Sequence, residues 1–183
     1  MIIWVIVLLL TACGSTKVNT AQSRFYQSFV TRFNVYHNGN EAYKEGLSAQ
    51  EKSHKDNYME IIPLFPVSKE NTRSSGSGSF DKAIEKSQKA IKLHSIKQKP
   101  KKKAGRKLSE KDKLWYAKKE YNPYLHNAWM LMGKAQFQKG EFLEAASTFS
   151  YITRLYSEDP KIVAEARMRM AQCYAELEWN YEA

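Results

Sequence analysis

The chain has 183 residues, which suits one domain of ordinary size or a short array of helices. Hydrophobic residues make up 43% of it and charged residues 26%, which excludes an intrinsically disordered or collagen-like chain, and 2 cysteines are too few for a disulfide-stabilised miniprotein. With 29 basic and 19 acidic residues the net charge is +10, so nucleic acid, anionic lipid and acidic proteins all remain open as partners until the charge is located.

Residues 1–10 (MIIWVIVLLL) form an apolar run that is too short to cross a membrane. As a helix that rises ~1.5 Å per residue it would reach roughly 15 Å, about half of a hydrocarbon core. That is the length of the apolar part of a signal peptide. The following residues, Leu10-Thr11-Ala12-Cys13, resemble the bacterial lipobox. The resemblance implies a lipoprotein signal peptide over residues 1–12, an acylated Cys13 and a flexible tether over residues 13–23. The alternative is a free cysteine after a buried apolar strand.

The remaining cysteine and the histidines form no catalytic or metal-binding pattern. If Cys13 is acylated, Cys173 has no partner in the chain and is expected to pack between helices as a small apolar residue. No Cys/His spacing typical of zinc occurs, so no metal and no cofactor is expected. Glu158 and Asp159 stand beside Pro160 and indicate a turn rather than a catalytic pair. The sequence therefore predicts no catalytic residue and no enzyme.

The C-terminal third predicts two antiparallel helices. Small and apolar residues recur at helical spacing over residues 125–135 and again over residues 142–156. Residues 139–141 (KGE) form a turn short enough to make the two helices antiparallel. Pro160 is expected to end the second helix.

A fixed offset relates this hairpin to the end of the chain, because Ala128 matches Ala166 and Ala135 matches Cys173. Such an offset is typical of stacked helical hairpins. The residues resemble a tetratricopeptide repeat, whose packing positions would be Trp129, Met132, Gly133, Ala145, Phe149 and Pro160. In that arrangement Gly133 and Ala145 allow the helices to approach closely, and Trp129 fills a groove rather than binding a ligand.

Residues 114–183 are accordingly expected to hold tetratricopeptide repeats, the last of them truncated. A truncated hairpin leaves an apolar face without a partner, so we expect the chain to be the N-terminal part of a longer repeat protein. The alternative is a last helix that docks alone.

The middle of the chain repeats the helical pattern with interruptions. Residues 80–93 have the spacing of the second helix of a hairpin. Its partner is expected within residues 25–58, where Asn38 and Gly39 would separate two helices. Residues 61–79 contain a Ser/Gly run and predict a flexible insertion, which lacks the Gly-Lys-Ser/Thr of a phosphate-binding loop.

The fold class expected for the whole chain is all-α. We expect a tetratricopeptide-type array of helical hairpins, an α-solenoid, with disordered basic and Gly/Ser-rich insertions. Within it, residues 24–96 would form an N-terminal helical region.

Nearly all of the positive charge lies in residues 97–119, where eleven basic residues face two acidic ones. Residues 97–113 are expected to be a flexible loop, and such a run is most often a solvated segment. The alternative is a site for an anionic partner such as phospholipid, lipopolysaccharide phosphate or an acidic protein face. The basic residues of that site would be Lys101, Lys102, Lys103, Arg106 and Lys107. Nucleic acid is not expected, because the loop has no interleaved aromatic residues to stack on bases.

Three longer stretches, residues 32–46, 89–96 and 121–137, resemble the N-terminal region of the PorW/SprE lipoproteins of the type IX secretion and gliding machinery. The resemblance implies a non-catalytic lipoprotein anchored in the outer membrane and facing the periplasm. Its repeats would link the motor and ring components to the outer-membrane translocon. The partners would then be protein components of the secretion machinery, with no nucleic acid and no small-molecule substrate. Only Cys13 carries over as a functional residue.

Two other functions fit the same residues. One is a different periplasmic tetratricopeptide lipoprotein that serves outer-membrane protein assembly or the cell wall. The other is a basic binding module that residues 97–119 hold at an anionic surface.

Overall fold

The computed structural model describes residues 18–101 and 108–178, and within them it contains helices and no strand. This confirms the all-α class. The helices are α2 (Ala21–Val30), η1 (Thr31–Tyr36), α3 (His37–Ser53), η2 (Pro66–Ser68), α4 (Glu70–Ser74), α5 (Ser77–His94), α6 (Glu110–Ala117), α7 (Leu125–Gln138), α8 (Phe142–Leu155) and α9 (Pro160–Glu176). Of these, η1 is a π-helix and η2 is a short 3₁₀-helix.

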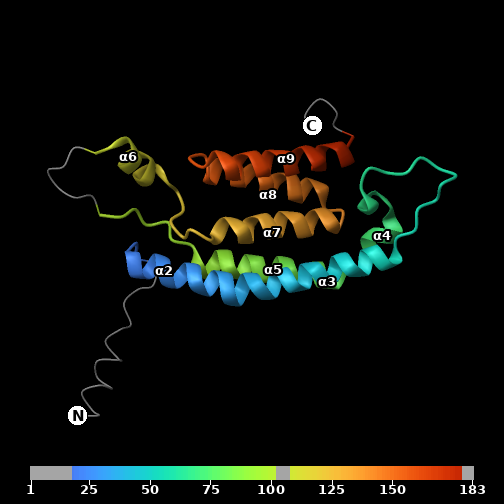
Figure 1. Ribbon diagram of the computed structural model, residues 1–183, viewed down its shortest axis with the longest axis horizontal. Helices are drawn as coiled ribbons and strands as arrows, with labels where there is room; N and C mark the ends of the chain where they lie inside the picture. The colour runs from blue at the N-terminus through green and yellow to red at the C-terminus, as the bar shows by residue number, and fades with distance from the viewer. Residues whose placement is uncertain (1–17, 102–107, 179–183) are drawn as a thin grey trace, which may run out of the picture.

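The long helices are stacked in chain order. Each of α3, α5, α7, α8 and α9 packs on the next, with smaller contacts from α3 to α7 and from α7 to α9. Figure 1 shows α2 and α3 along one edge of the molecule and α9 along the opposite edge, while α6 and α4 lie at opposite ends. Sequential helices that are adjacent in space bury one another's apolar faces with short connections.

No break occurs where Asn38 and Gly39 predicted one. The backbone stays helical from Ala21 to Ser53, through α2, η1 and α3. Gly39 is buried instead, and a methyl group there would lie 3.2 Å from side-chain atoms of Leu131 and Lys86. The prediction was wrong because the glycine serves a close approach between helices rather than a turn.

The helices α3 and α5 form the first hairpin. Gly46 of α3 faces Phe80 of α5, so a methyl group at Gly46 would lie 2.7 Å from the Phe80 ring. Gly76, the residue just before α5, lies beside this contact and has a φ of 79°. A methyl group at Gly76 would collide with the backbone of Gly46. Positive φ and the lack of space both require glycine at Gly76. The partner expected for residues 80–93 is therefore found in α3.

The helices α7 and α8 form the second hairpin, joined by a turn in which Gly140 has a φ of 81°. Here Gly133 faces Phe149, and a methyl group at Gly133 would again lie 2.7 Å from the ring. The same glycine-to-phenylalanine contact thus closes both hairpins.

The predicted flexible insertion at residues 61–79 is wrong for its second half, which is folded. It contains η2, α4 and the start of α5, and Val67 and Thr72 are buried. Arg73 holds this segment, since its Nε and Nη2 donate to the carbonyls of Val67 (2.7 Å) and Ser68 (3.0 Å). Burial of Val67 against the second hairpin, and the contacts of Thr72 with Gln50 and His54, outweigh the local preference of serine and glycine for irregular structure.

Three predicted boundaries also shift. The tether was expected to run to residue 23, but α2 already begins at Ala21, where the Thr20 side chain caps the helix. The basic loop was expected to run to residue 113, but α6 already begins at Glu110, where Ser109 and Asp112 form a capping box. Pro160 does not end α8, which stops at Leu155, but is the first residue of α9. Proline is favoured at that position because it needs no N–H there.

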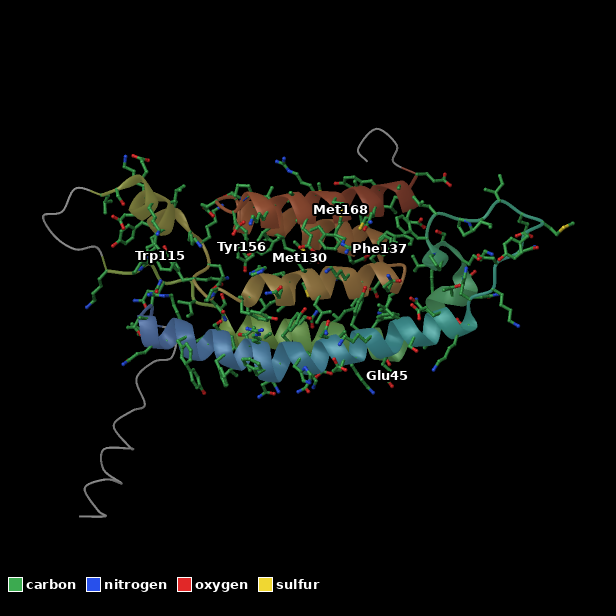
Figure 2. All side chains as sticks on the ribbon, viewed as in Figure 1. Glu45, Trp115, Met130, Phe137, Tyr156 and Met168 are labelled. Atoms are coloured by element: carbon green, nitrogen blue, oxygen red, sulfur yellow. The ribbon has the colours of Figure 1, made fainter. Side chains whose placement is uncertain are left out.

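The offset between the second hairpin and α9 is visible in their burial. Ala128 and Ala166 are both fully buried, as are Ala135 and Cys173. In contrast, Met130 is buried between helices and Met168, at the matching position, is half exposed. Figure 2 labels both side chains. The inner face of α9 is thus equivalent to that of α7.

Candidate functional site

A buried carboxylate joins the two connecting segments at one end of the helices. Glu120, which lies between α6 and α7, is buried, and its Oε1 accepts hydrogen bonds from the backbone N–H groups of Ile96 (2.8 Å) and Asn122 (2.8 Å). The N–H of Tyr121 (3.0 Å) also points to Oε1, and the hydroxyl of Ser95 donates to Oε2 at 2.5 Å. Four donors on one carboxylate compensate for its burial and fix the path of the chain after α5.

Asn122 extends this network to the N-terminal helix. Its Nδ2 donates to Thr31 Oγ1 (3.0 Å) and to the carbonyl of His94 (2.9 Å). His94 in turn places Nδ1 2.5 Å from Oε1 of Gln27, so that Nδ1–H is the donor, and burial lowers the pKa of His94. We call this set the polar junction; its members are Gln27, Thr31, His94, Ser95, Glu120 and Asn122. It ties α2 and η1 to the hairpins by hydrogen bonds, beside an apolar contact in which Val35 of η1 packs on Ala90 and Leu125.

A cleft of about 420 Å³ opens on one side of the polar junction. Its walls come from α2, α6, the segment before α7 and the corner between α8 and α9, and its aromatic side chains are Phe25, Trp115, Tyr121, His126 and Tyr156. Charges of both signs stand around it, from Arg24, Lys118, Glu158 and Asp159. Figure 2 shows Trp115 and Tyr156 at this end of the molecule.

Cations in the first cleft lie on an aromatic ring. The guanidinium of Arg24 is 5.1 Å and the ammonium of Lys118 is 5.4 Å from the Trp115 ring centre. The hydroxyl of Tyr156 is buried and has no hydrogen-bond partner among the described residues. Burial raises the pKa of Tyr156, so its hydroxyl stays protonated and can act as a donor. The cleft therefore offers aromatic surface, ionic groups and one buried donor.

A second cleft, of about 410 Å³, lies between α5, α7 and α8 and shares Glu120 and Leu155 with the first. Trp129 stands in its wall, with its ring centre 4.8 Å from that of Tyr151. The Trp129 Nε1–H is buried and unpartnered within the described part of the chain. Trp129 is partly buried and also packs against two groups of core residues.

The other predicted packing residues lie at the interfaces between helices. Ala145, Phe149 and Met132 are buried, and Gly133 meets the Phe149 ring. Pro160 lies apart from them at the start of α9. Cys173 is free and buried, and burial raises the pKa of its thiol to about 12.

Part of the basic region is engaged in contacts within the chain. Lys119 donates to the carbonyl of Arg154 (2.8 Å), near the end of α8, and Lys113 lies 2.6 Å from Glu110. Lys101 is exposed. The other four residues of the predicted anionic-partner site, Lys102, Lys103, Arg106 and Lys107, lie outside the described residues, as does the predicted lipidation site Cys13.

Exposed apolar side chains gather in two places, the second of which borders the first cleft at Phe25. One is the segment between α3 and η2, where Tyr58, Met59, Ile61 and Leu64 are largely exposed. The other is the outer face of α2 and η1, with Phe25, Tyr26, Phe29 and Phe33. Exposed apolar patches of this kind usually mark interaction surfaces.

Sequence reasoning did not find the polar junction or the clefts. Glu120 and Asn122 carry no local pattern, since their distant partners come from η1 and from the end of α5 and the residues just after it. The capping box of α6 was readable, because Ser109 precedes Asp112 by three residues.

Comparison of the chain with models of known protein families finds no match, and a search of curated proteins finds none. Among the described residues, no helix combines the length and the apolar character needed to cross a bilayer. In the same residues no group of His, Cys, Asp and Glu side chains is arranged to hold a metal ion.

Proposed function

We propose that the chain is a non-catalytic scaffold of the PorW/SprE type, a tetratricopeptide lipoprotein of the type IX secretion and gliding machinery. Acylated Cys13 anchors it in the outer membrane on the periplasmic side. The helical array then links motor and ring components to the translocon.

The observation that carries the repeat assignment is the shared contact of the two hairpins. Gly46 meets Phe80 in the first and Gly133 meets Phe149 in the second, and a methyl group on either glycine would lie the same 2.7 Å from the ring. Small residues opposite aromatic rings are what a tetratricopeptide hairpin needs for its close helix crossing. The matched burial of α7 and α9 supports a third helix of the same series.

The surface supports an adaptor role. Two clefts flank the polar junction, and an exposed apolar segment lies between α3 and η2. Surfaces of this kind bind protein segments, because aromatic anchors in pockets carry most of the affinity of an interface. The basic loop around Lys101 would add attraction to an anionic partner, which screening by salt weakens.

The anchor is tested with Cys13→Ala. We expect this variant to remain unprocessed and to lack the acyl mass on its N-terminal peptide, whereas the wild-type chain is acylated. Cys173→Ala is the matched control, because Cys173 is buried and its loss leaves acylation intact. A Cys13→Ala chain that still carries lipid contradicts the anchor.

The scaffold role is tested by affinity capture of the tagged wild-type chain from cross-linked cells. Mass spectrometry should find motor, ring and translocon components of type IX secretion, and deletion should block secretion of its cargo. Recovery of outer-membrane assembly subunits alone, with secretion intact, would replace this proposal by the alternative periplasmic lipoprotein.

A further inference from the structure

The first helical turns have their polarity reversed. On α2 and η1 the face toward the protein carries the buried polar residues Gln27 and Thr31, with buried Val35 only near the end of η1, and the face toward solvent carries three phenylalanines. Phe25 is 73%, Phe29 53% and Phe33 57% exposed. A helix that merely covers a core places apolar residues inward. Here the polar junction takes the inner face, so the outer face is free to serve as an interface.

The exposed rings form one continuous strip, which we call the phenylalanine stripe: Phe25, Tyr26, Phe29 and Phe33. The ring centres of Phe25 and Phe29 are 6.2 Å apart and those of Phe29 and Phe33 are 4.8 Å apart. At ~200 Å² per side chain, the exposed part amounts to roughly 480 Å², the size of the largest apolar patch on a typical monomer, which is often functional. The stripe stops where α3 begins.

The outer face of α3 is ordinary solvated surface. Glu41, Lys44 and Glu45 are exposed there, and Lys44 lies 2.9 Å from Glu41. Figure 2 shows Glu45 on this outer edge. The two halves of one continuous helix thus present different surfaces, one apolar and one charged.

Along the helical segment that carries the stripe every charged side chain is positive, although Glu158 and Asp159 line the cleft that Phe25 borders. No Asp or Glu occurs from Val18 to Asn40, while Arg24 and Arg32 do. Arg32 is exposed, and its guanidinium lies 5.0 Å from the Phe33 ring centre. Aromatic rings beside an exposed arginine fit the boundary between lipid phosphates and acyl chains.

The chain itself brings the stripe to a bilayer. Ala21, the first residue of α2, lies eight positions after Cys13. Even a fully extended chain of that length spans at most about 29 Å. An acyl anchor on Cys13 therefore holds the stripe within this distance of the lipid surface at a high effective concentration.

We propose that the phenylalanine stripe docks in the interfacial layer of a phospholipid bilayer, with Arg32 at the level of the phosphates. The docking rests on the proposed lipid anchor for its proximity to lipid. It adds a second contact that fixes the orientation of the array, because a tether alone leaves the array free to rotate.

A dye placed at position 29 measures the docking. The acylated chain carrying Phe29→Cys is labelled with an environment-sensitive fluorophore and reconstituted into vesicles of phosphatidylethanolamine and phosphatidylglycerol. The matched control is Glu45→Cys, on the same edge of the molecule. Cys173 stays unlabelled because it is buried and its pKa is raised to about 12.

The expected result is a difference between the two labels. A nitroxide on the lipid acyl chains should quench the label at position 29 about fivefold more than the label at position 45, since interfacial side chains lie ~5–10 Å deep. In a variant that adds Phe25→Ser and Phe33→Ser, the label at position 29 should be exposed to water and should no longer be quenched. Helical content should not fall, because both rings are exposed in the wild-type chain. Equal quenching of the two labels overturns the proposal.

Other outcomes identify another occupant and equally overturn it. Shielding of position 29 from an aqueous quencher that rises with protein concentration in the absence of vesicles indicates a second copy. Shielding that requires added secretion components indicates a protein partner.

Failure of the anchor has a separate signature. If the chain without an introduced cysteine takes up the dye, Cys13 is free, and this labelling contradicts its acylation. The labels at positions 29 and 45 are then compared in a Cys13→Ser background, where deep quenching at position 29 alone still supports docking.

Discussion

Gly133 lies where α7 and α8 come closest. A methyl group there would stand 2.7 Å from the Phe149 ring, and Phe149 is buried. We predict that Gly133→Ala lowers the free energy of unfolding by ~1–3 kcal/mol through overpacking. Gly78→Ala is the control, because no atom lies within 4 Å and its helical position gains up to ~1 kcal/mol. Urea unfolding measures both, and stabilisation by Gly133→Ala would contradict the close approach.

Glu120 is the residue on which the polar junction depends most. We predict that Glu120→Ala lowers the free energy of unfolding by about 3 kcal/mol or more, because it leaves the buried backbone N–H groups of Ile96 and Asn122 unpaired. Glu120→Gln keeps a carbonyl oxygen for those donors and should cost about half as much. Urea unfolding that ranks the two variants equally would show that the donors find other acceptors.

The sequence predicted the contacts of some residues and not those of others. Gly133 and Phe149 could be placed from the helical spacing, since both partners belong to one hairpin. Glu120 and Asn122 could not, because their meaning depends on residues such as Thr31 that are distant in sequence. Long-range hydrogen bonds leave no periodicity to detect.

At the scale of elements, the segment between α3 and η2 exposes apolar side chains without any packing role. Ile61 is 97% exposed. We predict that Met59→Ser with Ile61→Ser leaves the thermal midpoint unchanged and reduces capture of secretion components. Leu143→Ser is the control, an exposed apolar residue on α8. Undiminished capture by the double variant would exclude this segment from partner binding.

Long periodic helices were predicted better than short ones. The spacing in residues 125–156 is strong enough to predict α7 and α8, and Gly140 marks their turn. The helix α4 and the start of α5 lie in a Ser/Gly run, and they form because Val67 and Thr72 become buried against other elements. Tertiary burial decided these elements, and no local pattern reports it.

The whole molecule should lose stability below neutral pH. Burial lowers the pKa of His94 and of His126 below the usual histidine value of 6.5. Above about pH 7 both imidazoles are neutral in the folded and unfolded chains, so neither changes the stability. Below 6.5 the unfolded chain takes up protons first, and stability falls until the pH passes the lowered pKa values of the folded chain.

We therefore predict a thermal midpoint that is constant above about pH 7 and decreases as the pH falls through about 6. His94→Gln with His126→Gln should flatten the slope in this window, because neither side chain can then be protonated. A slope that persists unchanged in the double variant would assign it to other groups.

At this scale two hydrogen bonds connect elements that are not neighbours in the stack. Gln50 of α3 donates to the carbonyl of Gln138 at the end of α7 (2.8 Å), and Ser68 of η2 donates to Glu176 at the end of α9 (2.8 Å). An array held only by neighbouring helices would peel apart one hairpin at a time under a pulling force. Here these cross-links carry load alongside the helix interfaces, so stretching a single molecule should give one large rupture. In the proposed linking role the array would then transmit tension along its whole length instead of unfolding hairpin by hairpin.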